Sequence, residues 1–324
     1  IIDCNLIEEK KESILNEIIE GEKGKQITRF ISTHPDEDHL FGLKELDNTI
    51  TIKNFYCVKN KIKLDDKEDF NKYCELRDDP NKHFFIFKDC SRKWMNQSDE
   101  TIGSSGINIL WPNTNNKHFI DELKKLEEGE KKSANNISPI IKYSLSNGIT
   151  ALWFGDMEND FLEKIINNVE LPKADVIFAP HHGRNSGKIP KDILDKIGPK
   201  LIIIGEADSE YLNYYDGFDT ITQNKAKNIV LKCVTGKIHI YTANEIDSDF
   251  LVNCLEKDLT NYEKYEYFIS LVSTDTGFRP CEKIYKFALI PNSFTVGDEL
   301  SAKQEMIRYR ISEKYSKQIE ELFS

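Results

Sequence analysis

Long apolar segments are missing from this sequence of 324 residues. No apolar run approaches the roughly 20 residues that a membrane helix needs. The chain also shows no secretion signal, since it opens directly on the strand-like residues Ile1 to Cys4. Hydrophobic residues make up 39% and charged residues 31%, a balance typical of globular proteins rather than disordered or membrane proteins. We therefore expect no association with membranes.

Cysteine occurs only seven times, and no C-x-x-C pair is present. The odd number and the wide spacing argue against a disulfide framework and against a cysteine-based zinc site. Scattered cysteines of this kind are typical of small core residues in a reducing compartment. The cysteine usage therefore predicts a cytoplasmic location.

An excess of basic residues is also missing. Lys and Arg number 44 against 55 Asp and Glu, which gives a net charge of −11. Nucleic-acid-binding proteins usually carry the opposite sign, so the composition argues against broad backbone binding by the isolated chain. It still permits binding at a metal centre, where the ions supply the positive charge.

What the sequence does contain is a regular alternation of strand-like and helix-like segments up to residue 243. Two apolar runs meet at Asn147-Gly148, and two more meet at Thr235-Gly236; both patterns predict β-hairpins. The periodicity predicts further strands at 27–32, 54–58, 107–110, 175–179 and 201–204, and helices at 39–46, 66–78 and 161–166.

The pattern changes in residues 244–324, where we expect a mixed, partly helical accessory region. Residues 248–259 and 302–323 have helical spacing, and no cluster of ligand-type residues occurs there. The chain is therefore predicted to consist of a domain at 1–243 and this C-terminal region.

Residues 31–42, ISTHPDEDHLFG, place four potential metal ligands directly after an apolar run: His34, Asp36, Asp38 and His39. In an extended segment alternate residues face the same side, so the first three would share one side. His39 would begin the next helix and turn towards the same pocket. One loop at the end of a strand could thus present ligands to two metal ions.

Two further loops carry residues of the same kind. Asp156 follows Gly155 after a strand, and His181-His182 follow another strand. A bridging carboxylate and an imidazole would complete two ligand sets, and paired ions can activate water and stabilise a leaving oxygen. Asp3, also at a strand end, would be a buried acid behind the ligands. Any single His–Asp pair is more often a solvated surface feature, but the joint pattern favours a metal site.

The segments THPDEDH, FGD and APHHG resemble the metallo-β-lactamase fold, and within it the metallo-β-lactamase domain of ComEC-type competence proteins and their soluble relatives. The usual family motif is H-x-H-x-D-H, and Asp36 stands here in place of the second His, as in the ComEC-like branch. The similarity extends to LWP at 110–112, to Asn135, Asn136 and Ser138, and to Thr235-Gly236. The resemblance implies an α+β fold, a four-layer αββα sandwich over residues 1–243, whose first strand would precede Ile1.

The resemblance also implies roles for the ligand-type residues. His34 and Asp36 would bind the first ion, Asp38 and His39 the second, Asp156 would bridge them, and His181 would be the late ligand, with His182 beside it and the order within this pair left open. Asp38 and His182 are the predicted catalytic residues. Asn136 stands where other branches have a His. Together with Asp36 it makes the donor set harder, which permits Mn²⁺ or Mg²⁺ as well as Zn²⁺.

Arg184 and Ser186 depart from the family pattern, in which Ser usually follows His-His-Gly. Arg184 could hold a phosphate through two parallel hydrogen bonds. A solvent-facing position is an equally good interpretation, because loops lie mostly at the surface. Both residues are predicted to act on the substrate or behind the metal ligands.

The resemblance predicts a dinuclear metal-dependent hydrolase, above all a phosphodiesterase or nuclease that acts on DNA. One alternative is a hydrolase of a small phosphodiester or another ester, and another is a catalytically weak interaction subunit that retains the fold. The acidic charge and the C-terminal region predict a protein partner or self-assembly. A nuclease effector subunit in a bacterial defence complex is one hypothesis.

Overall fold

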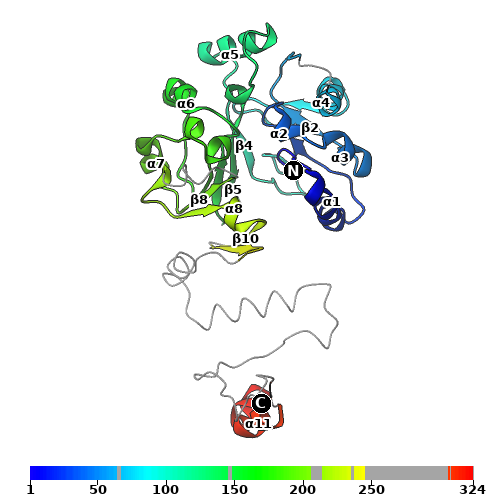
Figure 1. The fold of residues 1–324 in the computed structure, drawn as a ribbon, viewed down its shortest axis with the longest axis vertical. Helices are drawn as coiled ribbons and strands as arrows, with labels where there is room; N and C mark the ends of the chain where they lie inside the picture. Colours follow the sequence, from blue (N-terminus) through cyan, green and yellow to red (C-terminus); the bar gives the residue numbers. More distant parts are fainter. Residues whose placement is uncertain are drawn as a thin grey trace. The chain divides into compact units, whose positions relative to one another are not determined.

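The computed structural model describes residues 1–63, 67–144, 148–205, 214–234, 237–244, 306 and 308–323. The chain divides into two compact units, Ile1–Ile246 and Asp247–Ser324. The first unit is a mixed α+β structure (Figure 1). None of the helices among the described residues is long and apolar enough to cross a membrane.

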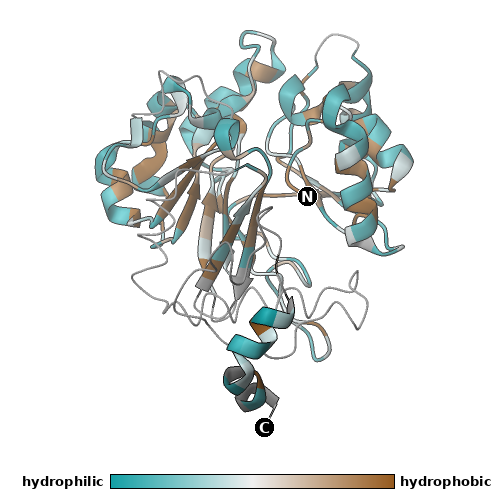
Figure 2. Ribbon diagram, turned by 60° about the horizontal axis from the view of Figure 1, so that its bottom comes forward, coloured by the Kyte–Doolittle hydropathy of each residue, from teal (hydrophilic) through white to brown (hydrophobic). Residues whose placement is uncertain are grey.

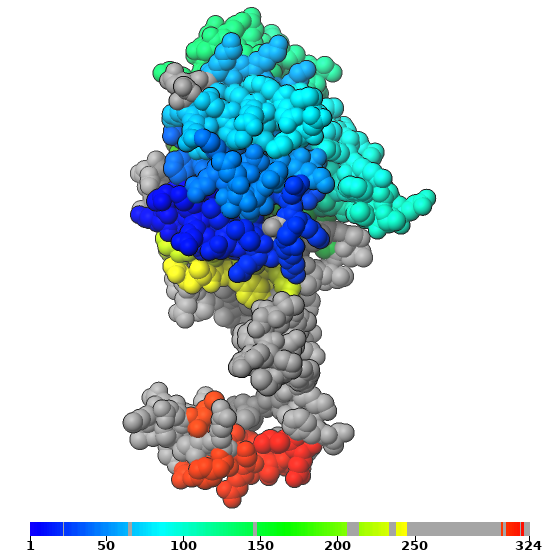
Figure 3. Space-filling model, turned by 90° about the vertical axis from the view of Figure 1, so that its right-hand side faces the viewer, coloured from blue at the N-terminus to red at the C-terminus, as the bar shows by residue number. Residues whose placement is uncertain are grey.

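Three parallel strands form the first sheet of this unit, in the order β1-β2-β3. Their bounds are Phe30–Ile31, Phe55–Cys57 and His83–Phe85. The predicted strand at Ile1 to Cys4 is reduced to one bridge, between Ile2 and Ile31. The helices on this side are α1 (Glu8–Glu22), α3 (Leu43–Thr49) and α4 (Glu68–Asp78), of which α4 packs against β2 and β3. These N-terminal segments, coloured dark blue to cyan, form the face of the first unit seen in Figure 3.

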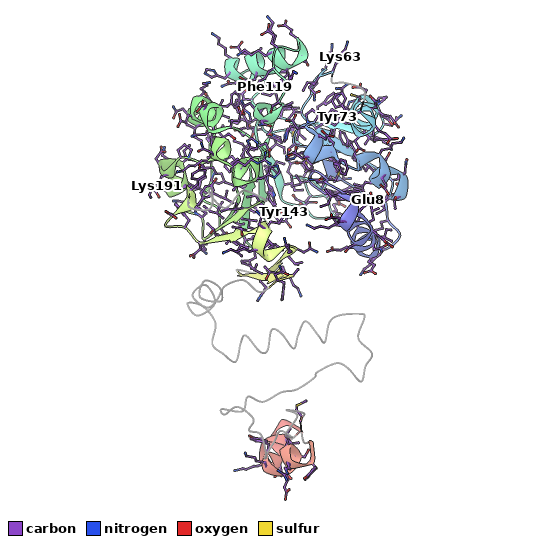
Figure 4. The ribbon with its side chains drawn as sticks, in the orientation of Figure 1. Glu8, Lys63, Tyr73, Phe119, Tyr143 and Lys191 are labelled. Carbon is purple, nitrogen blue, oxygen red and sulfur yellow. The ribbon has the colours of Figure 1, made fainter. Side chains whose placement is uncertain are left out.

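Six strands form the second sheet, in the order β4-β5-β6-β7-β8-β9. Pairing is antiparallel from β4 to β6 and parallel from β6 to β9. The bounds are Ile107–Trp111, Ile140–Ser144, Thr150–Trp153, Val176–Phe178, Leu201–Ile204 and Thr220–Thr222. Helices α6 (Asn159–Ile165) and α7 (Lys191–Ile197) lie on the far side of this sheet from α4. Figure 4 shows this, with Lys191 of α7 and Tyr73 of α4 on opposite sides.

The remaining elements of the first unit border these sheets. They are α2 (Glu37–Leu40), α5 (Lys117–Glu127), α8 (Gln223–Ala226) and the antiparallel pair β10 (Ile229–Val234) and β11 (Lys237–Thr242). The expected hairpins are present as the pairs β5-β6 and β10-β11, while Asn147 and Thr235-Gly236 in their turns lie outside the described residues.

The core is built from apolar side chains that the strand register brings together. Leu152, Ile177 and Ile202 are matched across β6, β7 and β8 and are fully buried. Phe30 and Phe55 stack across β1 and β2 with ring centroids 5.6 Å apart. Much of the strand surface in Figure 2 is coloured brown, as hydrophobic. Each such side chain stabilises the fold by about 1.5–3 kcal/mol, so both sheets are held by burial of apolar strand residues.

The single helix predicted at 39–46 is wrong, because the structure has two helices there. α2 starts at Glu37 and ends at Leu40, and α3 starts at Leu43. Gly42 has a φ of 83°, which a helix cannot contain. The Asp69 carboxylate of α4 accepts hydrogen bonds from Gly42 N (2.8 Å) and Lys44 N (2.9 Å). A side chain distant in sequence thus satisfies the backbone donors at the start of α3.

The early start of α2 also corrects the argument from alternation. Asp36 lies at the N-terminal end of α2, so Asp38 is a helical residue and not the third member of an extended run. Its side chain is therefore directed by the helix and not by the two-residue period of a strand.

In the second unit the structure describes α11 (Arg308–Lys314) and α12 (Ser316–Phe323), separated at Tyr315. The one helix predicted at 302–323 is thus interrupted. The helix predicted at 248–259 lies outside the described residues.

Candidate metal centre

Three chain segments that follow buried strands supply the candidate ligands. His34, Asp38 and His39 come after β1, Asp156 comes after β6, and His182 comes after β7. Strands β6 and β7 are parallel neighbours, with Trp153 paired to Phe178. The segments after them therefore emerge at the same edge of the sheet, which is where open α/β sheets place their sites.

Four of these side chains form one group: Asp38, His39, Asp156 and His182, each offering a ligand atom within 4.8 Å of the others. His39 Nε2 lies 3.2 Å from Asp156 Oδ1. His182 Nε2 lies 3.3 Å from Asp38 Oδ2 and 3.4 Å from Asp156 Oδ2. Two ligands of one tetrahedral ion, each about 2.1 Å from it, are about 3.4 Å apart. The spacing of the group therefore suits a single divalent ion.

Asp3 orients His39 from behind. Its Oδ2 lies 2.9 Å from His39 Nδ1, while Thr33 N (2.7 Å) and Thr33 Oγ1 (2.6 Å) donate to the same carboxylate. A carboxylate on Nδ1 leaves the Nε2 lone pair of the imidazole free and fixes the direction of the ring. Asp3 was predicted as a buried acid behind the ligands, and it is partly buried, with 15% of its side chain exposed.

His34 is held in the same way by two hydroxyl groups. Its Nδ1 lies 2.9 Å from Thr33 Oγ1 and 3.3 Å from Ser138 Oγ. Ser138 Oγ also accepts a hydrogen bond from Asp156 N at 3.1 Å. Neither Thr33 nor Ser138 was predicted to have a role in the site. The available signal for Thr33 was its hydroxyl group beside His34 at the end of a strand, whereas Ser138 precedes β5 and reaches His34 only through the fold.

Unpartnered imidazole nitrogens show that the residues fit a cation. Nε2 of His34, of His39 and of His182 is buried and has no hydrogen-bond partner among the described residues. Carboxylate oxygens nevertheless lie within ion-pair range of His39 Nε2 (3.2 Å) and of His182 Nε2 (3.3 and 3.4 Å), whereas the carboxylate of Asp36 is 3.9 Å from His34 Nε2. A buried polar atom without a partner costs about 1–3 kcal/mol. A metal ion that displaces the protons of His39 and His182 would accept the lone pairs of all three nitrogens, so the donor chemistry matches a divalent ion.

The charges of the group also favour a cation. Burial lowers the pKa of His39, but the carboxylates of Asp156 and Asp3 outweigh burial and raise it to about 11. Asp156 and Asp38 raise the pKa of His182 to about 9, and the His182 imidazole lowers the pKa of Asp38 to about 2. The carboxylates of this group raise the pKa of two imidazoles, which means that they stabilise positive charge nearby. They would stabilise the charge of a metal ion for the same reason.

His34 responds differently, since burial lowers its pKa. The ring therefore favours the neutral form, in which one nitrogen carries a lone pair. A neutral imidazole is the form that binds metal ions.

The His pair has an unusual backbone. His181 and His182 have φ values of 49° and 57°, a left-handed conformation that costs about 1–3 kcal/mol per residue outside glycine. The residue that this turn brings into the group is His182, whereas the sequence analysis named His181 as the ligand and left the order open. His181 Nε2 lies 3.9 Å from Asp156 Oδ2, and its Nδ1 lies 2.7 Å from Ser186 Oγ.

Asp36 lies at the margin of the group. Its Oδ2 is 3.9 Å from His34 Nε2, and the carboxylate accepts hydrogen bonds from Ser133 Oγ (3.1 Å) and Ala134 N (3.0 Å). A carboxylate has about four lone-pair positions, so these bonds leave Asp36 able to bind an ion. Its present contacts also tie the 133–134 segment to the site.

Asn136 is not part of the group. Its amide donates to Glu158 Oε2 at 2.9 Å, and its carbonyl oxygen accepts from Glu158 N at 3.0 Å. Both ends of the amide are thus held by Glu158, a residue that the sequence analysis did not single out.

A cavity of about 810 Å³ opens beside the group, and Asp38, His39, Asp156, His182 and the exposed Arg184 line it. Its size lies within the range of small-molecule sites.

No protein-family model matches the chain, and no curated protein matches it significantly.

Proposed function

We propose that this protein is a dinuclear metal-dependent hydrolase with the four-layer αββα sandwich of the metallo-β-lactamase fold. The two sheets with helices on their outer sides support this architecture. The observation that carries the function is the set of three buried imidazole Nε2 atoms that lack hydrogen-bond partners within the described residues and gather around the carboxylates of Asp38 and Asp156. Such an arrangement is costly without a cation and suits one well.

Asp38, His39, Asp156 and His182 would hold one ion. His34 and Asp36 would hold a second ion, with His181 nearby. Asp156 would be shared, because its Oδ2 lies 3.4 Å from His182 Nε2 of the first set and 3.9 Å from His181 Nε2. Zn²⁺ or Mn²⁺ suits this mixed nitrogen and oxygen set, and Mg²⁺ is permitted by its carboxylates. Two such ions supply an activated water and neutralise the charge that develops on a phosphate.

The protein residues would orient the reaction. Asp38 has 46% of its side chain exposed, so substrate would approach from its side of the group. Asp3 keeps His39 Nε2 directed at the group, and Thr33 does the same for His34. Arg184 lines the same cavity and would bind a phosphate oxygen of the substrate.

Phosphodiester bonds, above all those of DNA, are the proposed target. This choice rests on the resemblance to ComEC-type proteins, and it is an analogy between sites. Single-stranded DNA, duplex DNA, RNA and bis-p-nitrophenyl phosphate, incubated separately with the protein, distinguish a nuclease from an enzyme that acts on small diesters.

The first prediction concerns metal content. Protein purified without chelator should contain about two divalent ions per chain, and EDTA should abolish hydrolysis of bis-p-nitrophenyl phosphate. Added Mn²⁺ or Zn²⁺ should restore it and should raise the free energy of unfolding by about 2.7 kcal/mol at 100 times Kd. Mass spectrometry of the metals, thermal unfolding and the hydrolysis assay measure these effects.

A matched pair of variants controls for nonspecific metal binding. His39→Ala should lower the metal content, whereas His118→Ala, at an exposed position on α5, should leave it unchanged. Equal metal content in the two variants would contradict the proposed site.

We further propose that the C-terminal unit binds a protein partner or a second copy of the chain, in the cytoplasm. Met306, which precedes α11, and Tyr309 on α11 are 62% and 68% exposed there, and exposed apolar side chains that lie close together often mark contact sites. A role as nuclease effector in a bacterial defence complex is one form of this proposal.

The second prediction tests that unit. A chain that ends at Ile246 should hydrolyse bis-p-nitrophenyl phosphate at the rate of the full chain, because the candidate ligands all lie before residue 183. It should also lose self-assembly or partner binding, measured by light scattering and co-purification. If the shortened chain assembled as the full chain does, the C-terminal unit would not be the docking element.

A further inference from the structure

The cavity beside the metal group reaches well beyond it. In addition to the ligands it is lined by Gln223 of α8, by Lys227 and Asn228 after that helix, and by Ile229 of β10. Its volume of about 810 Å³ is near the upper end of the range for ligand sites, about 300–1,000 Å³. The space therefore accommodates more of a substrate than one phosphate.

Two cationic side chains from different parts of the chain line this cavity without a counter-ion. Arg184 follows the His pair and Lys227 lies between α8 and β10; both are exposed. Neither forms an ion pair within the described residues. By contrast, Lys191 on nearby α7 is paired with Asp195 at 2.8 Å. Lys10 also lines the cavity but has contacts of its own.

The net charge of the chain makes these two residues notable. With 55 acidic against 44 basic residues, most cations can find a carboxylate partner. Two cations that line one cavity and remain unpaired raise the local concentration of anions there. They also offset the acidic metal ligands along the path by which a phosphate chain would enter.

The backbone of Lys227 is held in a conformation that keeps this residue beside the cavity. Lys227 has φ 60° and ψ −118°, a combination that costs about 1–3 kcal/mol outside glycine. Its N–H donates to Gln223 O at 2.8 Å, and Asn228 O accepts from Ala243 N at 3.0 Å. The flanking hydrogen bonds thus hold the residue in this conformation beside the cavity.

We propose that Arg184 and Lys227 bind phosphates that flank the scissile one, so that the substrate is a nucleic-acid strand and not an isolated diester. The inference rests on the proposed function, because it takes the metal group as the position of the scissile phosphate. Each flanking phosphate receives one cationic side chain, and the strand follows the cavity from the His pair to β10.

Two contacts make this strand binding weak and only mildly dependent on salt. For single strands, log K falls with log salt by about 0.7 per neutralised phosphate, so two contacts give a slope of about −1.4. An extended basic surface would give a much steeper slope. The inference therefore agrees with a chain whose overall charge repels nucleic acid.

The test measures binding of fluorescein-labelled thymidine octanucleotide to the full chain in EDTA, between 25 and 200 mM salt. EDTA prevents cleavage and removes any contribution of metal to binding. The wild type should show a slope of about −1.4. Lys227→Gln and Arg184→Gln should each reduce it to about −0.7 and weaken binding about tenfold at low salt. Lys227→Arg should keep the wild-type slope.

Lys225→Gln is the matched control, since Lys225 is exposed on α8 two positions away and does not line the cavity. Its slope should equal that of the wild type. An unchanged slope in Lys227→Gln, an equal loss in Lys225→Gln, or no binding by the wild type would overturn the inference.

Hydrolysis of bis-p-nitrophenyl phosphate by the wild type with Mn²⁺ tests the proposed function separately. Hydrolysis together with unchanged salt slopes would leave the hydrolase standing and reject the strand-binding pair. Reduced slopes without any hydrolysis would retain the pair and reject the hydrolase.

Discussion

Asp38→Ala should reduce hydrolysis of phosphodiesters by more than about a hundredfold while the protein stays folded. Loss of a group behind a metal ligand typically costs about 10–100-fold in metal affinity or activity, so loss of a ligand should cost more. Asp38 Oδ2 lies 3.3 Å from His182 Nε2, and the side chain is 46% exposed. Its removal therefore takes an anionic donor from the group and leaves no cavity in the core.

The measurements are kcat/KM on bis-p-nitrophenyl phosphate, metal content, and the midpoint of thermal unfolding in EDTA. Glu37→Ala is the control, because Glu37 is the preceding residue of α2 and pairs with Lys67 at 2.5 Å instead of facing the group. It removes the same charge from the same helix. Turnover by Asp38→Ala at the rate of Glu37→Ala would contradict the proposed metal site.

Gly155→Ala should destabilise the protein by about 2–4 kcal/mol, from backbone strain of about 1 kcal/mol and crowding of about 1–3 kcal/mol. Gly155 has a φ of 55°, and an added Cβ would lie 2.6 Å from Ser138 Oγ and 2.7 Å from Ser138 Cβ. Ser138 has no room to move, because it is fully buried and holds both His34 and Asp156 N.

Gly129→Ala separates the effect of backbone strain from the effect of crowding. Gly129 has a φ of 75°, but an added Cβ there would meet nothing within 4 Å, so only the backbone strain of about 1 kcal/mol applies. Urea unfolding of both variants in EDTA measures the difference. Gly155→Ala should also lower metal content, because it displaces Ser138. Equal unfolding midpoints for the two variants would show that the contact at Ser138 is not rigid.

The elements that the sequence predicted best are those in which local and tertiary preferences agree. β8, at Leu201–Ile204, is buried at every residue, and its continuous apolar run is the pattern of a parallel strand covered on both faces. The helix at 39–46 failed because the Asp69 carboxylate, which belongs to α4, binds the backbone of residues 42–44. Local periodicity contains no information about such a distant partner.

The sequence by itself determined the types of candidate ligand and their place after β1, β6 and β7, because the carboxyl ends of strands are where polar side chains can leave an apolar core. Only the tertiary structure decided which of them meet. The left-handed turn at the His pair brings His182 and not His181 into the group, and Glu158 holds Asn136 elsewhere. Thr33 directs His34 as its neighbour in the sequence, but Ser138 directs it through a contact that depends on how β1 lies against the 135–138 segment. Such contacts are set by three-dimensional packing, in which residues about a hundred positions apart become neighbours, and spacing along the chain cannot reveal them.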